Sequence, residues 1–199
     1  PGATGNYSIA FGVAFGVSVL IMLYNYHRYR NGIVKVFPKV FEIGILVITL
    51  AILIFEVVSN PSYEWSKHWT DVISSSCLLA LSLFSILIGK PFTIQFAMEK
   101  VPEEYWGSEM FYFVNLIISA VWVLEFALSI MFSLLSIYVY PDNNAARIAP
   151  GIVILVLALK FTTEFPKYMR ERAQKTSSNH SQDAQSGDVE ANIAPMHRK

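Results

Sequence analysis

Long apolar runs alternate with short polar connectors along this chain. Five runs are long enough to cross a bilayer as helices, at about residues 8–26, 40–59, 70–89, 110–138 and 148–165. A hydrocarbon core about 30 Å thick requires about 20 helical residues, and these runs provide them. The pattern predicts an all-α, polytopic membrane helical bundle with five transmembrane helices, occupying residues 1–172.

The remaining residues, 173–199, lack aromatic side chains and are rich in Ser, Asn, Gln and Asp. Such a segment has too little apolar surface to offset the entropy lost on ordering. We expect a disordered C-terminal tail.

Composition supports a membrane protein, because 54% of the 199 residues are hydrophobic and only 15% are charged. Soluble domains carry about 25% charged residues. The formal net charge is zero, so no overall positive field favours a nucleic-acid partner. The expected surroundings are the lipid bilayer and other membrane proteins.

The placement of Lys and Arg predicts an orientation. The first and third connectors and the segment after the last run hold ten of these residues, whereas the second and fourth connectors hold two, Lys67 and Arg147. Basic connectors stay on the cytoplasmic side. The N-terminus is therefore expected outside or in a lumen, and the C-terminus in the cytoplasm.

Small residues are spaced by four in the first run, at Ser8, Gly12 and Gly16. Such a face lets two membrane helices approach closely. We favour packing within the bundle, with a homo-oligomer as the alternative. In the second run, Glu42 and Glu56 lie near the two ends, where we expect solvated flanking side chains.

The stretch from Lys90 to Trp106 is the densest polar segment between two apolar runs, and Pro91 and Pro102 bracket it. Apolar residues interleaved with charged ones suit an element lying on the membrane surface. An ordinary polar loop is the equally weighted alternative.

Several classes of chemistry find no support. Clustered glycines for a phosphate loop are absent, Cys77 is the single cysteine, and the predicted topology separates His27 from His68 across the membrane. We therefore expect no enzyme activity, no cofactor and no metal site.

Polar residues within the apolar runs include two charged ones, Glu125 in the fourth and Lys160 in the fifth, with Asp71 and Asn115 nearer the ends of the third and fourth. Charged groups in a bilayer are costly and are usually paired. Glu125 and Lys160 lie at similar depth from the connector between their runs, which predicts an intramembrane pair. It is either a structural clasp or a functional site.

The order of residues from the third to the fourth run resembles the intracellular septation protein A (YciB-like) family of small five-span membrane proteins. The resemblance rests on Lys90, Pro91, Gln95, Pro102, Trp106, Asn115 and Trp122. It implies a non-enzymatic role in envelope maintenance or septation, exerted through other membrane proteins. These seven residues then become a candidate partner-binding stretch.

The sequence therefore predicts an integral membrane organising or accessory protein. The alternative is a small solute or ion transporter or channel that uses Glu125 and Lys160.

Overall fold

The computed structural model describes residues 5–59, 63–139 and 144–193; the side chains of 5–7, 63–64, 67–68, 144–147 and 176–193 lie outside the described part. The chain divides into two compact units, Pro1–Leu159 and Lys160–Lys199. The first unit contains the bundle and the candidate site.

The described residues form helices without any β-strand: α1 (Gly5–Arg30), α2 (Val40–Ser59), α3 (Tyr63–Leu87), α4 (Thr93–Ala97), the 3₁₀-helix η1 (Glu103–Tyr105), α5 (Glu109–Val139) and α6 (Asn144–Ile193). Five contain segments long and apolar enough to cross a membrane: Ser8–Arg30, Val40–Ser59, Trp69–Leu87, Glu109–Val139 and Ile148–Lys175. The predicted all-α membrane bundle with five spanning helices is confirmed.

The last span differs from its predicted length, because α6 continues as helix beyond Phe165. Within the second unit, Phe161 stacks on Phe165 with ring centroids 4.8 Å apart, and exposed Lys167 pairs with Glu164 at 2.8 Å. These contacts between neighbouring turns accompany the extension. The disordered tail from residue 173 stays a prediction.

Two helices end in the same glycine-dependent motif. Gly32 after α1 and Gly89 after α3 both have φ of 70°. The N–H of Ile33 donates to the carbonyl of Arg28 at 2.9 Å, and that of Lys90 to the carbonyl of Ser85 at 3.0 Å. This is the Schellman arrangement, in which glycine adopts the left-handed conformation without steric cost. Each motif turns the chain sharply into a connector.

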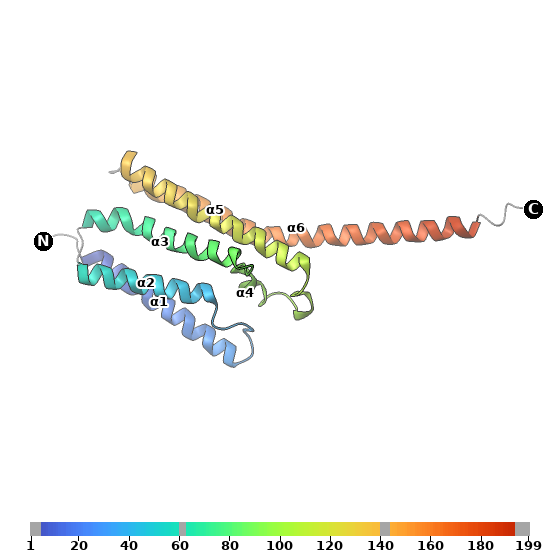
Figure 1. The fold of residues 1–199 in the computed structure, drawn as a ribbon, viewed down its shortest axis with the longest axis horizontal. Helices are drawn as coiled ribbons and strands as arrows, with labels where there is room; N and C mark the ends of the chain where they lie inside the picture. Colours follow the sequence, from blue (N-terminus) through green and yellow to red (C-terminus); the bar gives the residue numbers. More distant parts are fainter. Residues whose placement is uncertain (1–4, 60–62, 140–143, 194–199) are drawn as a thin grey trace, which may run out of the picture. The chain divides into compact units, whose positions relative to one another are not determined.

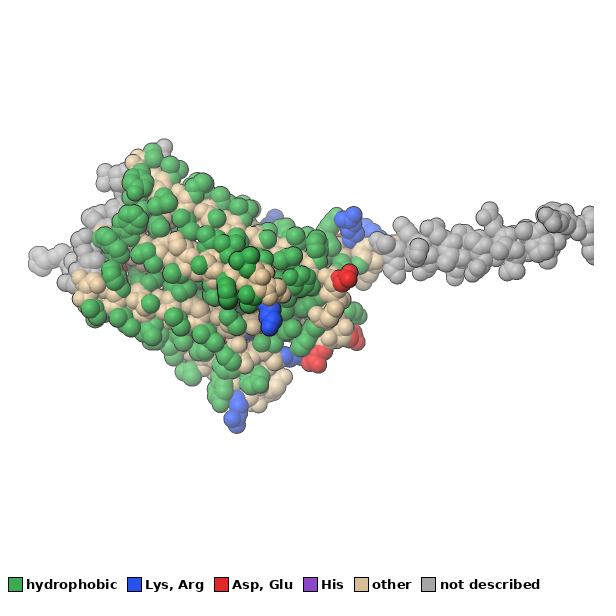
Figure 2. Space-filling model, in the orientation of Figure 1, with side chains coloured by type: hydrophobic (Ala, Val, Ile, Leu, Met, Phe, Trp, Pro, Cys, Tyr) green, Lys and Arg blue, Asp and Glu red, His purple; other side chains and the backbone are tan. Residues whose placement is uncertain are grey.

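The spanning helices of the first unit form a row, with α1 against α2, α2 against α3, and α3 against α5 (Figure 1). The pairing of α3 with α5 is the most extensive, and α4 also packs on α5. Hydrophobic side chains cover most of the bundle face seen in Figure 2. An apolar exterior of this kind is what a lipid environment requires.

Small polar side chains occupy much of the interior of this bundle. Several hydroxyl, amide and carboxylate residues on the spanning helices are buried: Glu56, Ser66, Thr70, Ser82, Ser85, Asn115, Ser119, Glu125 and Ser136. Small polar residues let helices approach and hydrogen-bond where lipid gives no hydrophobic drive for association.

The expected role of the small-residue face on α1 receives no support within the chain. A Cβ placed at Gly12 or Gly16 meets nothing within 4 Å, so no helix of the described structure closes on them. Close approach occurs instead at Gly44 of α2, where an added Cβ would overlap the Leu81 side chain of α3. The homo-oligomer alternative for the α1 face stays open.

Gly44→Leu is expected to lower the thermal stability of the bundle, whereas Gly12→Leu is not. Both changes gain helix propensity of about 1 kcal/mol. Only the first places a bulky side chain in the space that Leu81 of α3 occupies, and overpacking costs about 1–3 kcal/mol. Thermal unfolding of the two variants in the same detergent measures the difference, and equal transition temperatures would contradict close helix contact at Gly44.

Candidate functional site

The polar stretch from Lys90 to Trp106 is a folded connector. It contains α4, a turn and η1, and the side chains of Pro91, Phe92 and Thr93 are buried. Neither sequence-based expectation describes it fully, because it is neither one surface-lying amphipathic element nor an open loop. The proline at its start removes a donor and limits the backbone, which suits a turn into a short helix.

Hydrogen bonds attach the start of α4 to its neighbours. The Thr93 hydroxyl donates to the backbone carbonyl of Asn115 at 2.8 Å, and its oxygen lies 2.9 Å from the Ser119 hydroxyl. The Phe92 N–H donates to the Ser85 hydroxyl oxygen at 3.2 Å. Since these groups are buried, each bond satisfies atoms that would otherwise lose their hydration without replacement. The connector is thereby fixed to α3 and α5.

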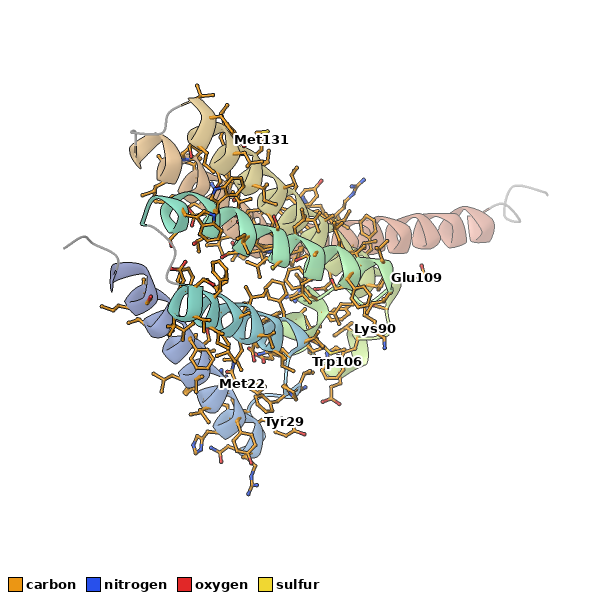
Figure 3. All side chains as sticks on the ribbon, turned by 60° about the vertical axis from the view of Figure 1, so that its left-hand side comes forward. Met22, Tyr29, Lys90, Trp106, Glu109 and Met131 are labelled. Atoms are coloured by element: carbon orange, nitrogen blue, oxygen red, sulfur yellow. The ribbon has the colours of Figure 1, made fainter. Side chains whose placement is uncertain are left out.

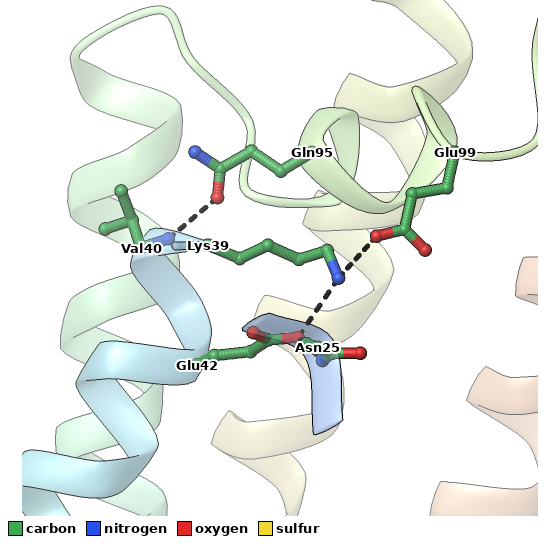
Figure 4. A network of polar contacts seen from close by, with 6 residues as sticks. All are labelled: Asn25, Lys39, Val40, Glu42, Gln95 and Glu99. Carbon is green, nitrogen blue, oxygen red and sulfur yellow. Dashed lines mark hydrogen bonds and ion pairs between the residues drawn. The ribbon is translucent and has the colours of Figure 1, made fainter. Parts of the chain in front are cut away.

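A second set of contacts ties α4 to the start of α2, and we call it the connector cluster: Asn25, Lys39, Glu42, Gln95 and Glu99. Lys39 Nζ lies 3.1 Å from Glu42 Oε1 and 2.6 Å from Glu99 Oε1 (Figure 4). The second contact is an ion pair. Lys39 therefore joins two segments separated by 60 positions in the sequence.

The other two members of the connector cluster complete the hydrogen bonding. Asn25 Nδ2 donates to Glu42 Oε1 at 2.8 Å, and the Val40 N–H donates to Gln95 Oε1 at 2.8 Å. The latter bond satisfies one of the free N–H groups at the start of α2, as a capping side chain does. Gln95 thus caps a helix 55 residues away in sequence.

Lys39 is almost fully buried, with 3% of its side chain exposed. Its ammonium also lies 4.9 Å from the ring centroid of Phe96, a cation–π distance. Glu42 is 13% exposed and serves both Lys39 and Asn25. Our expectation of a solvated flanking acid at Glu42 is therefore wrong, because a lysine close in sequence holds it inside the protein.

A weaker pair reinforces the same contact from outside. Lys35 Nζ lies 3.1 Å from Glu103 Oε1 and 5.2 Å from the Trp106 ring centroid, with the two charged side chains 39% and 67% exposed. Solvent-exposed pairs contribute about 0–1 kcal/mol. Trp106 is itself fixed by donating from Nε1 to the Val101 carbonyl at 3.0 Å. The stability of the connector thus depends mainly on the buried set around Lys39.

The structure assigns different environments to the seven residues of the candidate partner-binding stretch. Some are built into the fold and others face outward: Pro91 and Asn115 are buried, Gln95, Trp106 and Trp122 are half-buried, and Lys90 and Pro102 are exposed.

Further exposed residues of this connector were not singled out by the sequence pattern. They lie within η1 or just before it: Lys100, Glu103, Glu104 and Tyr105. Figure 3 shows Lys90, Trp106 and Glu109 toward one end of the bundle and Met131 toward the other. The exposed charges and the Tyr105 ring are the groups of this connector that are accessible to a partner.

Two buried acids lie away from the connector cluster. Glu125 Oε1 accepts a hydrogen bond from the Ser129 hydroxyl at 3.2 Å, and Glu125 Oε2 is buried without a hydrogen-bond partner. Glu125 and Lys160 belong to different units, so their pairing stays a prediction. Glu56, expected to be solvated, is only 4% exposed, because α3 covers it and Ser66 donates to its Oε2 at 3.0 Å.

Among the described residues, no group of three or more His, Cys, Asp or Glu side chains is arranged to hold a metal ion. In comparisons with protein-family models, curated proteins and solved structures, nothing matched this chain. Interpretation of the site therefore rests on its own geometry.

Proposed function

We propose that this chain is an integral membrane organising or accessory protein whose folded connector binds other membrane proteins. The observation that carries the proposal is the fixed attachment of residues 90–106 to α2 and α5 through Lys39 and Thr93. A rigid connector presents its exposed groups without the entropy cost of ordering a loop on binding. A role in envelope maintenance or septation is what the family resemblance adds.

The exposed groups indicate the chemistry of the contact. Lys90 and Lys100 supply positive charge, Glu103 and Glu104 negative charge, and Tyr105 is 54% exposed. Tyrosine is enriched at protein interfaces because one large, rigid ring combines apolar area with a polar end. We propose a partner surface with mixed charges and an apolar position for this ring.

Site-specific photo-crosslinking in native membranes tests the proposal. A benzoylphenylalanine at Tyr105 is expected to capture a reproducible, stoichiometric protein. The matched control is the same substitution at Tyr138, which is 74% exposed near the other end of α5. The same products from both positions, or none from Tyr105, would overturn the proposal.

The proposal also requires the connector to face the cytoplasm, as the basic residues predict. In a Cys77→Ser background, single cysteines at Tyr63 and Asn143 are expected to react with an impermeant thiol reagent added to intact cells. Cysteines at Asn31 and Ser178 are expected not to react. Asn143 and the side chains of Tyr63 and Ser178 lie outside the described residues. Labelling at position 31 from outside would reverse the orientation.

The buried acids favour a second candidate function, a small transporter or channel for a solute or ion. Unpartnered Glu125 Oε2 lies in a bundle whose interior also contains buried hydroxyls. Acids inside a membrane commonly mark an ion or proton pathway. Thermal stabilisation of the purified protein by a particular solute would favour this function over partner binding.

A double-mutant cycle tests the predicted partner of Glu125. If the pair forms, Glu125→Gln and Lys160→Met each leave one charge uncompensated, and the double variant is more stable than either single variant. Strictly additive changes in thermal stability would contradict the pair. Retained cellular activity in a stable double variant would identify it as a structural clasp.

A further inference from the structure

Two buried oxygen atoms without hydrogen-bond partners occur on facing helices near one end of the bundle. Glu56 of α2 is 4% exposed, and its Oε1 has no partner although its Oε2 accepts from Ser66. Thr70 of α3 is 5% exposed, and its Oγ1 has no partner either. Buried polar atoms are nearly always satisfied, so these two oxygens on packed helices require an explanation.

Helix geometry directs these two oxygens toward each other. Ser66 and Thr70 are four residues apart, so they lie on one face of α3, about 5.4 Å apart along its axis. Since α2 and α3 run in opposite directions (Figure 1), Thr70 lies beside α2 on the N-terminal side of Glu56. Helical side chains lean toward the N-terminus of their own helix. Glu56 therefore leans toward Thr70, and Thr70 leans toward Ser66.

We propose that Glu56, Ser66 and Thr70 form a binding site for a small monovalent cation of the Na⁺ class. Carboxylate and hydroxyl oxygens are hard ligands suited to hard cations. The single carboxylate balances a single positive charge, which matters because uncompensated charge is costly away from water. A bound cation would contact both oxygens that the protein leaves unpaired.

The site lies near one end of α2. Glu56 precedes the end of α2 at Ser59 by three residues, or about 4.5 Å along the helix axis. This distance of about one helical turn places the Glu56 carboxylate just inside that end of the bundle. The inference is independent of the proposed partner binding, because Tyr105 and the connector cluster take no part in it.

Binding of ²²Na⁺ to the purified full chain in lipid nanodiscs provides the test. The wild-type protein is expected to bind the ion saturably, and Glu56→Gln to lose that binding. Thr70→Val is expected to weaken it by more than about tenfold, since loss even of groups that only support a ligand costs about 10–100-fold in metal affinity. Glu109→Gln, at an exposed acid, and Thr49→Val, whose hydroxyl bonds only to its own helix, are the controls.

The threonine variant keeps the test valid if Glu56→Gln fails to fold. Thr70→Val removes a hydroxyl without a partner in a nearly isosteric change, so it is expected to melt no lower than the wild type in choline chloride. In NaCl of equal ionic strength, the wild type is expected to gain thermal stability and Thr70→Val is not. Absence of ²²Na⁺ binding to the wild type, or unchanged binding in Thr70→Val, would overturn the cation site.

Discussion

Lys39→Met is expected to destabilise the first unit by about 3–5 kcal/mol, the typical cost of removing one partner from a buried ion pair. The Lys39 side chain is 3% exposed, and its ammonium contacts two carboxylates, those of Glu42 and Glu99. Without it, two acids remain beside each other with no positive charge between them. Thermal unfolding in lipid nanodiscs and the level of folded protein in membranes measure the effect.

Lys35→Met is the matched control. Lys35 also links the segment between α1 and α2 to the folded connector of residues 90–106, but its side chain is 39% exposed. Its loss is expected to cost at most about 1 kcal/mol. Adding Glu42→Gln and Glu99→Gln to Lys39→Met removes the stranded charges and should recover part of the stability. Equal unfolding temperatures for Lys39→Met and Lys35→Met would show that the connector cluster does not stabilise the fold.

Thr93→Val is expected to cost about 1–3 kcal/mol, which is the penalty for leaving a buried polar group unsatisfied. Valine has nearly the same shape but loses both bonds of the hydroxyl. The Asn115 carbonyl and the fully buried Ser119 hydroxyl then lack this partner. Since α4 begins at this residue, the connector should also become more accessible to protease, which limited proteolysis can follow alongside thermal unfolding.

Thr49→Val tests whether the effect comes from the contact between α4 and α5. The Thr49 hydroxyl donates only to carbonyls one turn back in its own helix, at 2.9 and 3.1 Å. Loss of this hydroxyl is expected to change the thermal stability little, because hydrogen bonds to carbonyls of the same helix do not stabilise it. An equal loss of stability in both variants would mean that Thr93 is not an anchor.

The spans were predictable because bilayer crossing imposes a local rule on about 20 consecutive residues. The second predicted run, 40–59, coincides with α2, and the first, third and fourth differ from their helices only at the ends. The fifth run, 148–165, lies within the much longer α6. Helix ends depend on local chemistry that hydropathy does not register. At α1, for example, His27, Arg28 and Arg30 extend the helix because basic side chains favour its C-terminal carbonyls.

The candidate site was less predictable because its contacts join distant positions. Gln95 was singled out as a partner-binding residue, yet it caps α2 through the Val40 N–H. Lys39 was counted only as one of ten basic residues, although it is the centre of the connector cluster. One signal was present: the acids at 99 and 103 and the lysines at 35 and 39 were predicted on the same membrane side. Opposite charges there suggest pairing, but not which pair is buried.

The placement of Glu56 has a consequence for biogenesis. A carboxylate at the centre of a spanning helix costs about 2.5–3.5 kcal/mol on insertion, and less near an end. The α2 segment has the highest mean hydropathy of the five candidate spans, 2.5, so it can enter the bilayer despite this acid. Ser66, however, reaches the membrane only with α3. Nascent chains that end between α2 and α3 would expose the Glu56 carboxylate to lipid. Membrane quality control would then recognise them as unassembled helices.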